Sequence, residues 1–186
     1  MRRTYAPKGK TPIQEAWHRK GRVSAISAVT ISPVRRRPNL YFRLLPDNTN
    51  AHGEDTAAFL AQLRGEIRGP MTVLWDQSKI HERSGVVKRY LAKHPEIVTE
   101  DFPGYAPETN PDEGVWGWTK YHRIPNYAPD DIRGLRSRLW DELSHLRGRP
   151  ELLTSFIRHA GIPVLPRKLH ICLKALQGNG FRPVKR

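Results

Sequence analysis

The sequence has a single cysteine, Cys172, which excludes an internal disulfide and a cysteine-based zinc site. It has no run of about 18 apolar residues, the length of a membrane-spanning helix, so we expect no membrane partner. The first eight residues contain no apolar segment of the secretory type. Internal repeats and low-complexity tracts are also missing. These absences favour a globular protein of the cytoplasm, and 186 residues suffice for one compact domain with appended structure.

Acidic residues are scarce: 18 Asp and Glu stand against 32 Lys and Arg, giving a net charge of +14. The excess is uneven, since residues 1–40 carry +9, residues 41–113 carry −4 and residues 114–186 carry +9. Basic flanks around an acidic centre favour a polyanion partner, because Lys and Arg that neutralise phosphates release condensed counterions. A basic protein whose charges are merely solvated is the open alternative.

Apolar periodicity predicts strands, then helices and strands in alternation. Strands are expected over residues 23–31 and 40–45, paired antiparallel, then over 71–75 and from 97. Helical spacing predicts helices over residues 55–68, 86–93, from Pro111, 129–146 and 150–160. Residues 102–111 contain three prolines and are expected to be irregular, and the tail from Gly178 is expected to be loose. This order indicates a mixed α/β layered domain.

Two acidic residues lie at positions that catalytic or ligand-binding residues often occupy. Asp76 directly follows the expected strand 71–75, and ligands of open α/β sheets usually bind at the carboxyl ends of strands. Glu113 begins an expected helix whose spacing brings it onto one face with Trp116 and Lys120. Each also has a purely structural alternative. Asp76 could start a turn, and Glu113 could be present because the helix dipole stabilises a negative charge in the first turn. His81, without a second His or Cys nearby, is weak evidence for a metal ligand.

Three segments together resemble a known family. Leu74-Trp75-Asp76-Gln77-Ser78-Lys79-Ile80-His81 resembles a strand followed by Asp-Asn-x-x-x-His, and residues 102–116 resemble Leu-Pro-x-Tyr-Ser-Pro-x-Leu-Asn-Pro-Ile-Glu-x-x-Trp. Residues 3–12 resemble Arg-x-Trp-Ala-Pro-x-Gly-x-x-Pro. These are motifs of the mariner-related, bacterial insertion-sequence branch of the DDE transposases. The resemblance covers roughly residues 1–122.

The resemblance implies an RNase H-like fold, a mixed sheet flanked by helices. It implies a partial catalytic domain over residues 1–125 and a helical, basic C-terminal extension over residues 126–186. Asp76 would be the second acidic metal ligand and Glu113 the third, with His81 and Asn110 as supporting residues. We expect Arg35, Arg36, Arg37 and Lys120 to contact DNA, although a basic loop is often only solvated. Gln77 and Asp112 depart from the family pattern, which has Asn and an apolar residue there.

The family's first catalytic aspartate lies on a strand just upstream of the Ala-Pro-x-Gly segment, and this sequence starts inside that segment. We therefore expect the fold to lack its first strand and the chain to be incomplete as an enzyme. No helix-turn-helix region precedes the segment either. Two explanations stay open: a truncated remnant of a mobile element, or the second reading frame of an element expressed by frameshifting.

By the same resemblance, the complete enzyme would cleave and join DNA phosphodiesters with Mg²⁺ or Mn²⁺, ions that prefer carboxylate oxygens. Its partners would be double-stranded DNA (the transposon ends and the target), the product of an upstream frame, and a second copy in a homodimer. We expect a cytoplasmic, nucleoid-associated protein. The alternative function is a non-catalytic DNA-binding remnant of a transposase.

Overall fold

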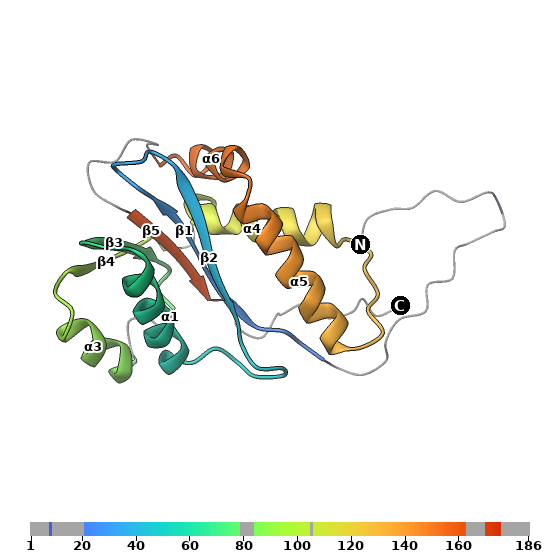
Figure 1. The fold of residues 1–186 in the computed structure, drawn as a ribbon, viewed down its shortest axis with the longest axis horizontal. Helices are drawn as coiled ribbons and strands as arrows, with labels where there is room; N and C mark the ends of the chain where they lie inside the picture. Colours follow the sequence, from blue (N-terminus) through green and yellow to red (C-terminus); the bar gives the residue numbers. More distant parts are fainter. Residues whose placement is uncertain (1–7, 9–20, 79–83, 105, 163–169, 176–186) are drawn as a thin grey trace.

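The structure is a computed structural model that describes residue 8 and residues 21–78, 84–104, 106–162 and 170–175. Its centre is one five-stranded sheet with helices on both faces (Figure 1). The prediction of a mixed sheet flanked by helices is therefore confirmed. None of the helices within the described residues is long and apolar enough to cross a bilayer. The predictions for residues 1–12 and for the tail from Gly178 fall almost wholly outside the described residues.

The strands follow the order β2-β1-β5-β3-β4 across the sheet. β1 pairs antiparallel with both β2 and β5, whereas β3 pairs parallel with both β4 and β5. Their bounds are β1 Ala25–Ile31, β2 Pro38–Leu44, β3 Met71–Trp75, β4 Ile97–Asp101 and β5 His170–Ala175. The sheet is thus mixed, with β5 as its middle strand.

Helices cover the two faces in two groups, as Figure 1 shows for α1 and α3 on one side and α5 and α6 on the other. A 3₁₀ turn, η1, precedes α4, and a π-helical turn, η2, follows it. The bounds are α1 Gly53–Glu66, α3 Gly85–Ala92, η1 Pro107–Thr109, α4 Pro111–Trp118, η2 Thr119–Arg123, α5 Ile132–Arg147 and α6 Pro150–His159.

The alternation of side chains along β1 divides the core into two layers. Ile26 and Ala28 are fully buried with α1 and β3, while Ala25 and Val29 are buried with α4, α5 and α6. Both faces of β1 are therefore covered, which explains why all seven of its residues are buried. A strand buried on both faces stands near the middle of its sheet.

The predicted strands and helices correspond to observed ones, and the strand predicted over residues 71–75 has the bounds of β3. The predicted antiparallel pairing of the first two strands is confirmed by β1 and β2. β5 was not predicted. It lies between β1 and β3 and pairs with both of them.

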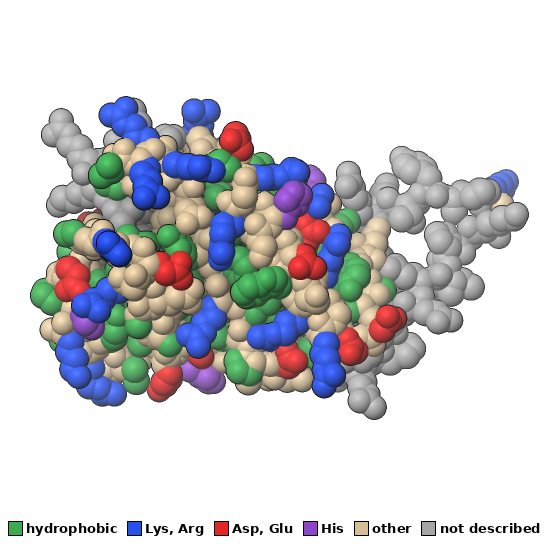
Figure 2. Space-filling view, in the orientation of Figure 1, with side chains coloured by type: hydrophobic (Ala, Val, Ile, Leu, Met, Phe, Trp, Pro, Cys, Tyr) green, Lys and Arg blue, Asp and Glu red, His purple; other side chains and the backbone are tan. Residues whose placement is uncertain are grey.

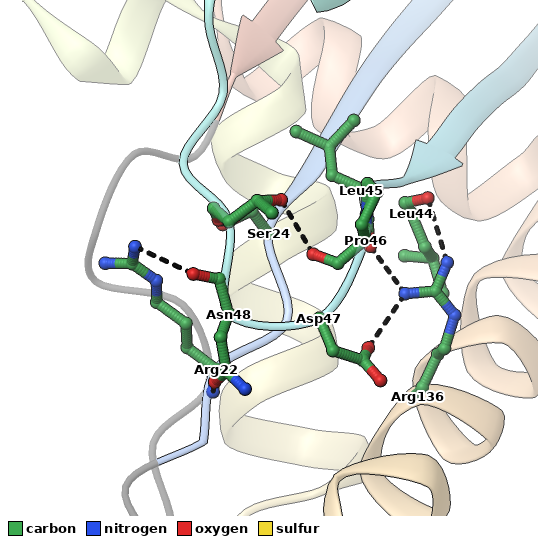
Figure 3. A network of polar contacts seen from close by, with 9 residues as sticks. Arg22, Ser24, Leu44, Leu45, Pro46, Asp47, Asn48 and Arg136 are labelled. Carbon is green, nitrogen blue, oxygen red and sulfur yellow. Dashed lines mark hydrogen bonds and ion pairs between the residues drawn. The ribbon is translucent and has the colours of Figure 1, made fainter.

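The connection from β2 to α1 is fixed by polar contacts from both sides (Figure 3). Arg136 of α5 donates hydrogen bonds to the carbonyl oxygens of Leu44 and Leu45 and forms an ion pair with Asp47 at 3.1 Å. Arg22 donates through its guanidinium to the carbonyl oxygen of Asn48 at 3.3 Å. These contacts tie α5, part of the predicted C-terminal extension, to the sheet.

The predicted boundary between residues 125 and 126 stays a prediction. α5 and α6 contribute buried residues to the same core as β1 and β2, among them Leu139, Leu143 and Leu153. β5 also lies beyond that boundary and is part of the common sheet.

Candidate functional site

Asp76 lies at the carboxyl end of β3, one residue beyond Trp75. Its side chain is half-buried, and its Oδ1 accepts a hydrogen bond from the backbone N–H of Ser78 at 3.3 Å. The carbonyl of Trp75 accepts from Phe102 N–H at 2.8 Å, which ties the end of β3 to the residue after β4. The carboxylate is thus held at the end of a buried strand that is second from the sheet edge.

Glu113 lies in the first turn of α4, where a negative charge is favoured by the helix dipole. Asn110 caps this helix: its Oδ1 accepts from Asp112 N–H at 3.0 Å, and its carbonyl accepts from Glu113 N–H at 3.0 Å. Pro111 at the first helical position fits the same pattern. Asn110 therefore fixes the orientation of the turn that carries Glu113, a geometry compatible with the supporting role predicted for it.

Asp112, whose exposed fraction is 0%, points into the protein. Its Oδ2 accepts a hydrogen bond from Ser27 Oγ at 2.5 Å and another from Trp116 Nε1 at 3.1 Å. Trp116 Nε1 also lies 2.9 Å from Ser27 Oγ, so the three side chains form one buried polar cluster between α4 and β1. Asp112, one of the two residues that depart from the family pattern, thus helps to fasten α4 to the sheet.

Lys120 lies in η2 rather than on α4. The backbone N–H of Ile124 donates to Thr119 O at 3.0 Å, the i to i+5 spacing of a π turn, which adds one residue to the helical repeat. The single helical face that was expected to carry Glu113, Trp116 and Lys120 is therefore interrupted before Lys120. Such turns are frequent at functional sites.

β3 and α4, the two elements that position Asp76 and Glu113, both adjoin the middle strand. β5 pairs with β3, and α4 contacts β5 and β1. Within the described residues, however, no three His, Cys, Asp or Glu side chains come together in a way that could hold a metal ion. Asp76 and Glu113 are the two candidate ligands that the sequence named. His81 lies outside the described residues.

The arginines that we predicted to contact DNA do not lie beside Asp76. Arg35, Arg36 and Arg37 are exposed in the turn between β1 and β2. Arg35 and Arg37 line a groove of about 1010 Å³ together with Arg68 and Arg147. Its lining includes Met71 and Thr72, at the opposite end of β3 from Asp76, and Met71 is about 17 Å from Asp76 along the strand at 3.3 Å per residue. We call this surface the arginine groove.

Two acidic residues reduce the net positive charge of the arginine groove. Glu66 and Glu96 also line it, and Arg64 donates a hydrogen bond from Nε to Glu96 Oε1 at 2.7 Å. That hydrogen bond lowers the pKa of the Glu96 carboxyl and raises the pKa of Arg64. Figure 2 shows Lys and Arg side chains distributed over the visible face with acidic ones among them, so the positive charge of that face is not confined to one patch.

One charged cluster had only a partial signal in the sequence. Glu142 of α5, with only 5% of its side chain exposed, accepts from Arg123 Nε at 2.7 Å and lies 2.8 Å from Arg138 Nη2. The spacing of Glu142 and Arg138 on one helix could have suggested their pairing, but Arg123 reaches Glu142 from η2. This cluster joins η2 to α5 and positions no predicted site residue directly.

Comparison with family models finds a match to the model described as DDE superfamily endonuclease over residues 1–136. The match includes Asp76, Asn110 and Glu113 and continues into the beginning of α5. No curated protein and no solved structure matches the chain.

Proposed function

Since the chain belongs to the DDE superfamily of endonucleases, we propose that it is the catalytic-domain part of a DNA transposase of the mariner-related, bacterial insertion-sequence type. Its substrate would be the phosphodiester backbone of double-stranded DNA, at transposon ends and target. The observation that carries the proposal is that one family match spans both the strand that precedes Asp76 and the helix whose first turn carries Glu113. Asp76 and Glu113 are the residues proposed to act in cleavage and strand transfer.

The proposed divalent ion, Mg²⁺ or Mn²⁺, prefers carboxylate oxygens, and Asp76 and Glu113 would supply two of its ligands. Two carboxylates are a poor fit for a pair of ions beside a phosphate, since the ions repel each other and must be held rigidly. The described residues contain no third partner for this set. We therefore derive no catalytic step through the metal for this chain.

DNA binding would rest on the basic surface. The arginine groove supplies Arg35, Arg37, Arg68 and Arg147, and a basic side chain, Lys120, lies in the turn that follows α4. Arginine suits phosphate because its planar fork can donate two hydrogen bonds at once. The spread of positive charge over the visible face favours a contact with the DNA backbone rather than with individual bases.

The second candidate function is a non-catalytic DNA-binding protein, and the lack of a three-ligand group among the described residues favours it. The two functions differ in metal dependence, because binding of phosphate by Lys and Arg requires no divalent ion. If another polypeptide, such as an upstream-frame product or a second copy, supplied a third carboxylate, the chain would be catalytic in that complex and would only bind DNA on its own.

The test measures binding and cleavage of a supercoiled plasmid by the purified chain in Mg²⁺, in Mn²⁺ and in EDTA. Cleavage that depends on metal and is abolished by Asp76→Asn or Glu113→Gln, while Asp141→Asn, an exposed change on α5, leaves it intact, would show that the chain acts as a nuclease without a third carboxylate from another polypeptide. Binding without cleavage, equal in EDTA and metal, favours the second function. Absence of binding even at low salt overturns both.

A further inference from the structure

The π-helical turn η2 exposes an aromatic ring in a basic stretch of the chain. The side chain of Tyr121 in η2 is 66% exposed, and the next two residues are His122 and Arg123. Residues 114–129, which include this turn, contain no acidic residue. A single exposed ring is ordinary on a protein surface. The meaning of Tyr121 therefore depends on the side chains that surround it.

A second ring, next to Tyr121, is already held in place. His122 stacks on Trp118 with 4.7 Å between the ring centroids and 22° between the ring planes. Trp118 packs against the core that α5 and α6 share with β1, so it supports the exposed ring of His122 from within. An aromatic side chain whose orientation is fixed beforehand loses little conformational freedom when a ligand stacks on it.

A third ring, that of Tyr127, is 39% exposed and is fixed from α5. Its hydroxyl donates to the carbonyl oxygen of Gly134 at 3.3 Å, and the guanidinium carbon of Arg138 lies 5.9 Å from its ring centroid. Arg138 also pairs with Glu142 at 2.8 Å, and Glu142 accepts a hydrogen bond from Arg123 at 2.7 Å. One continuous set of contacts therefore joins Tyr127 to η2.

The charge of this surface favours an anionic ligand. The side chains of Arg123 and Arg138 are 37% and 43% exposed, whereas that of Glu142 is 5% exposed, so the cations and not the carboxylate face the solvent. Two arginines against one carboxylate leave this group positively charged. We call the three rings and the two arginines the aromatic patch; its residues are Tyr121, His122, Tyr127, Arg123 and Arg138.

Unpaired nucleotides match both components of the aromatic patch. Their bases offer flat π faces on which aromatic side chains stack, and their phosphates pair with arginine. In a duplex the base faces are covered by neighbouring base pairs, so stacking on a protein ring requires a base that has left the duplex. An acidic peptide would satisfy the arginines alone. Since the chain belongs to a superfamily of DNA endonucleases, the expected strand is DNA.

The aromatic patch continues the helix that carries Glu113. Tyr121 follows Glu113 by eight residues, which is about 12 Å at 1.5 Å per helical residue. Gly117 lies midway between them, and an added Cβ there would meet nothing within 4 Å. At 3.4 Å per nucleotide of one strand, the separation corresponds to about three or four nucleotides. A base on Tyr121 would therefore belong to the same strand end as a phosphodiester beside Glu113.

We propose that the aromatic patch binds the unpaired bases of a DNA strand end, with the three rings as stacking surfaces and the two arginines at the phosphates. This inference rests on the proposed function for the choice of DNA, but it requires neither a metal ion nor cleavage. It also gives a role to the buried carboxylate of Glu142, which holds both arginines beside the rings.

The experiment measures binding of the full chain to a short fluorescent single strand of DNA and to the blunt duplex of the same sequence, both in EDTA. Tyr121→Ala is expected to weaken binding to the single strand at least about fivefold, the loss of one stacked base, and to change binding to the duplex less. Tyr121→Phe keeps the ring and is expected to retain the affinity of the unaltered chain. The matched control is Trp140→Ala, which removes another exposed ring, one that contacts Phe42.

A Tyr121→Ala variant that binds the single strand as tightly as Trp140→Ala does overturns the inference. An equal loss for single strand and duplex also overturns it, because the contact would then be with the backbone alone. Where Tyr121→Ala fails to fold, His122→Ala gives the second measurement, and here too the single strand must lose more affinity than the duplex.

Two further outcomes separate the alternatives. Tighter binding of an RNA strand of the same sequence overturns the assignment to DNA. Failure of the proposed function has a different signature, because the unaltered chain then cleaves no plasmid while its binding of single strands still depends on Tyr121.

Discussion

Ser27 on β1 and Asp112 on α4 are joined by a hydrogen bond of 2.5 Å although 85 residues separate them in the sequence. Trp116 Nε1 approaches both side chains, so the contact is a closed polar cluster within an apolar layer. Hydrogen bonds within a buried cluster of this kind restrict the motion of the element that it holds. Here that element is the first turn of α4, which carries Glu113.

Ser27→Ala removes the hydroxyl donor to Asp112 and leaves a buried carboxylate with one fewer hydrogen bond. We expect the free energy of unfolding to fall by about 1–3 kcal/mol. Urea unfolding followed by tryptophan fluorescence measures the change. Ser155→Ala, on the exposed surface of α6, is the control and should alter stability little. A loss no larger than that of the control would contradict a structural role for the cluster.

Gly114 lies where α4 packs closely on α6. A Cβ at this position would lie 2.7 Å from Phe156 Cγ and 2.9 Å from Phe156 Cβ. Gly114→Ala is therefore expected to destabilise the protein by about 1–3 kcal/mol through overpacking.

Gly117 on the same helix is the control for Gly114, since an added Cβ there meets nothing within 4 Å. Gly117→Ala is expected to stabilise the protein by about 0.5–1 kcal/mol, the usual gain of alanine over glycine in a helix. Thermal unfolding of the two variants should move in opposite directions. Equal shifts of the two would contradict the close packing of α4 on α6.

Glu142 links η2 to α5 through Arg123 and Arg138. Glu142→Gln removes the charge from a side chain that is only 5% exposed, and we expect a loss of about 1.5–3 kcal/mol, as for hydrogen bonds to charged groups. Asp141→Asn, at the exposed neighbouring position, should leave unfolding in urea unchanged. Equal effects of the two variants would argue against the cluster.

Glu96 provides a prediction about pH. Its pKa in the folded protein lies below the ordinary value, mainly because Arg64 donates a hydrogen bond to it. A lowered folded-state pKa contributes stability above the unfolded-state pKa, and that contribution is lost as the pH falls through the folded value. The stability difference between the protein and Glu96→Gln should thus be present at neutral pH and vanish in acid. Urea unfolding across the acid range measures it, with Glu100→Gln as the control; a difference that persists in acid would contradict the ion pair.

Arg35 and Arg37 provide a prediction about DNA. If the arginine groove binds the backbone, replacing both by alanine weakens binding to all duplex sequences alike. It also reduces the slope of log affinity against log salt by about 0.9 for each phosphate that the protein no longer neutralises. Fluorescence anisotropy with two unrelated duplexes measures both quantities. Arg158→Ala, on the exposed surface of α6, is the control, and an unchanged salt slope in the double variant would exclude the groove.

Local pattern was sufficient for much of the fold. The run 71–75 is short, apolar and followed by a polar residue, so β3 could be located from its own residues. α4 could be placed because Asn110 and Pro111 mark a helix start. Asp76 and Glu113 were named from the same local features together with the family resemblance.

What the sequence did not reveal depends on contacts between distant segments. β5 was missed because six residues cannot be recognised as a middle strand until β1 and β3 are seen to flank them. The burial of Asp112 depends on Ser27, and that of Glu142 on Arg123, and neither pairing has a signature along the chain. Lys120 was placed on an α-helical face because a π turn cannot be read from residue spacing.

The position of β5 in the sheet has a consequence for biosynthesis. A ribosome makes β1, β2, β3 and β4 before β5, so both pairs of strands leave the exit tunnel while the place between them is still empty. Pairing across such a long stretch of chain is slow, and exposed strand edges promote aggregation in the interval. Nascent chains stalled before residue 170 should therefore need chaperone protection that chains released after residue 175 do not.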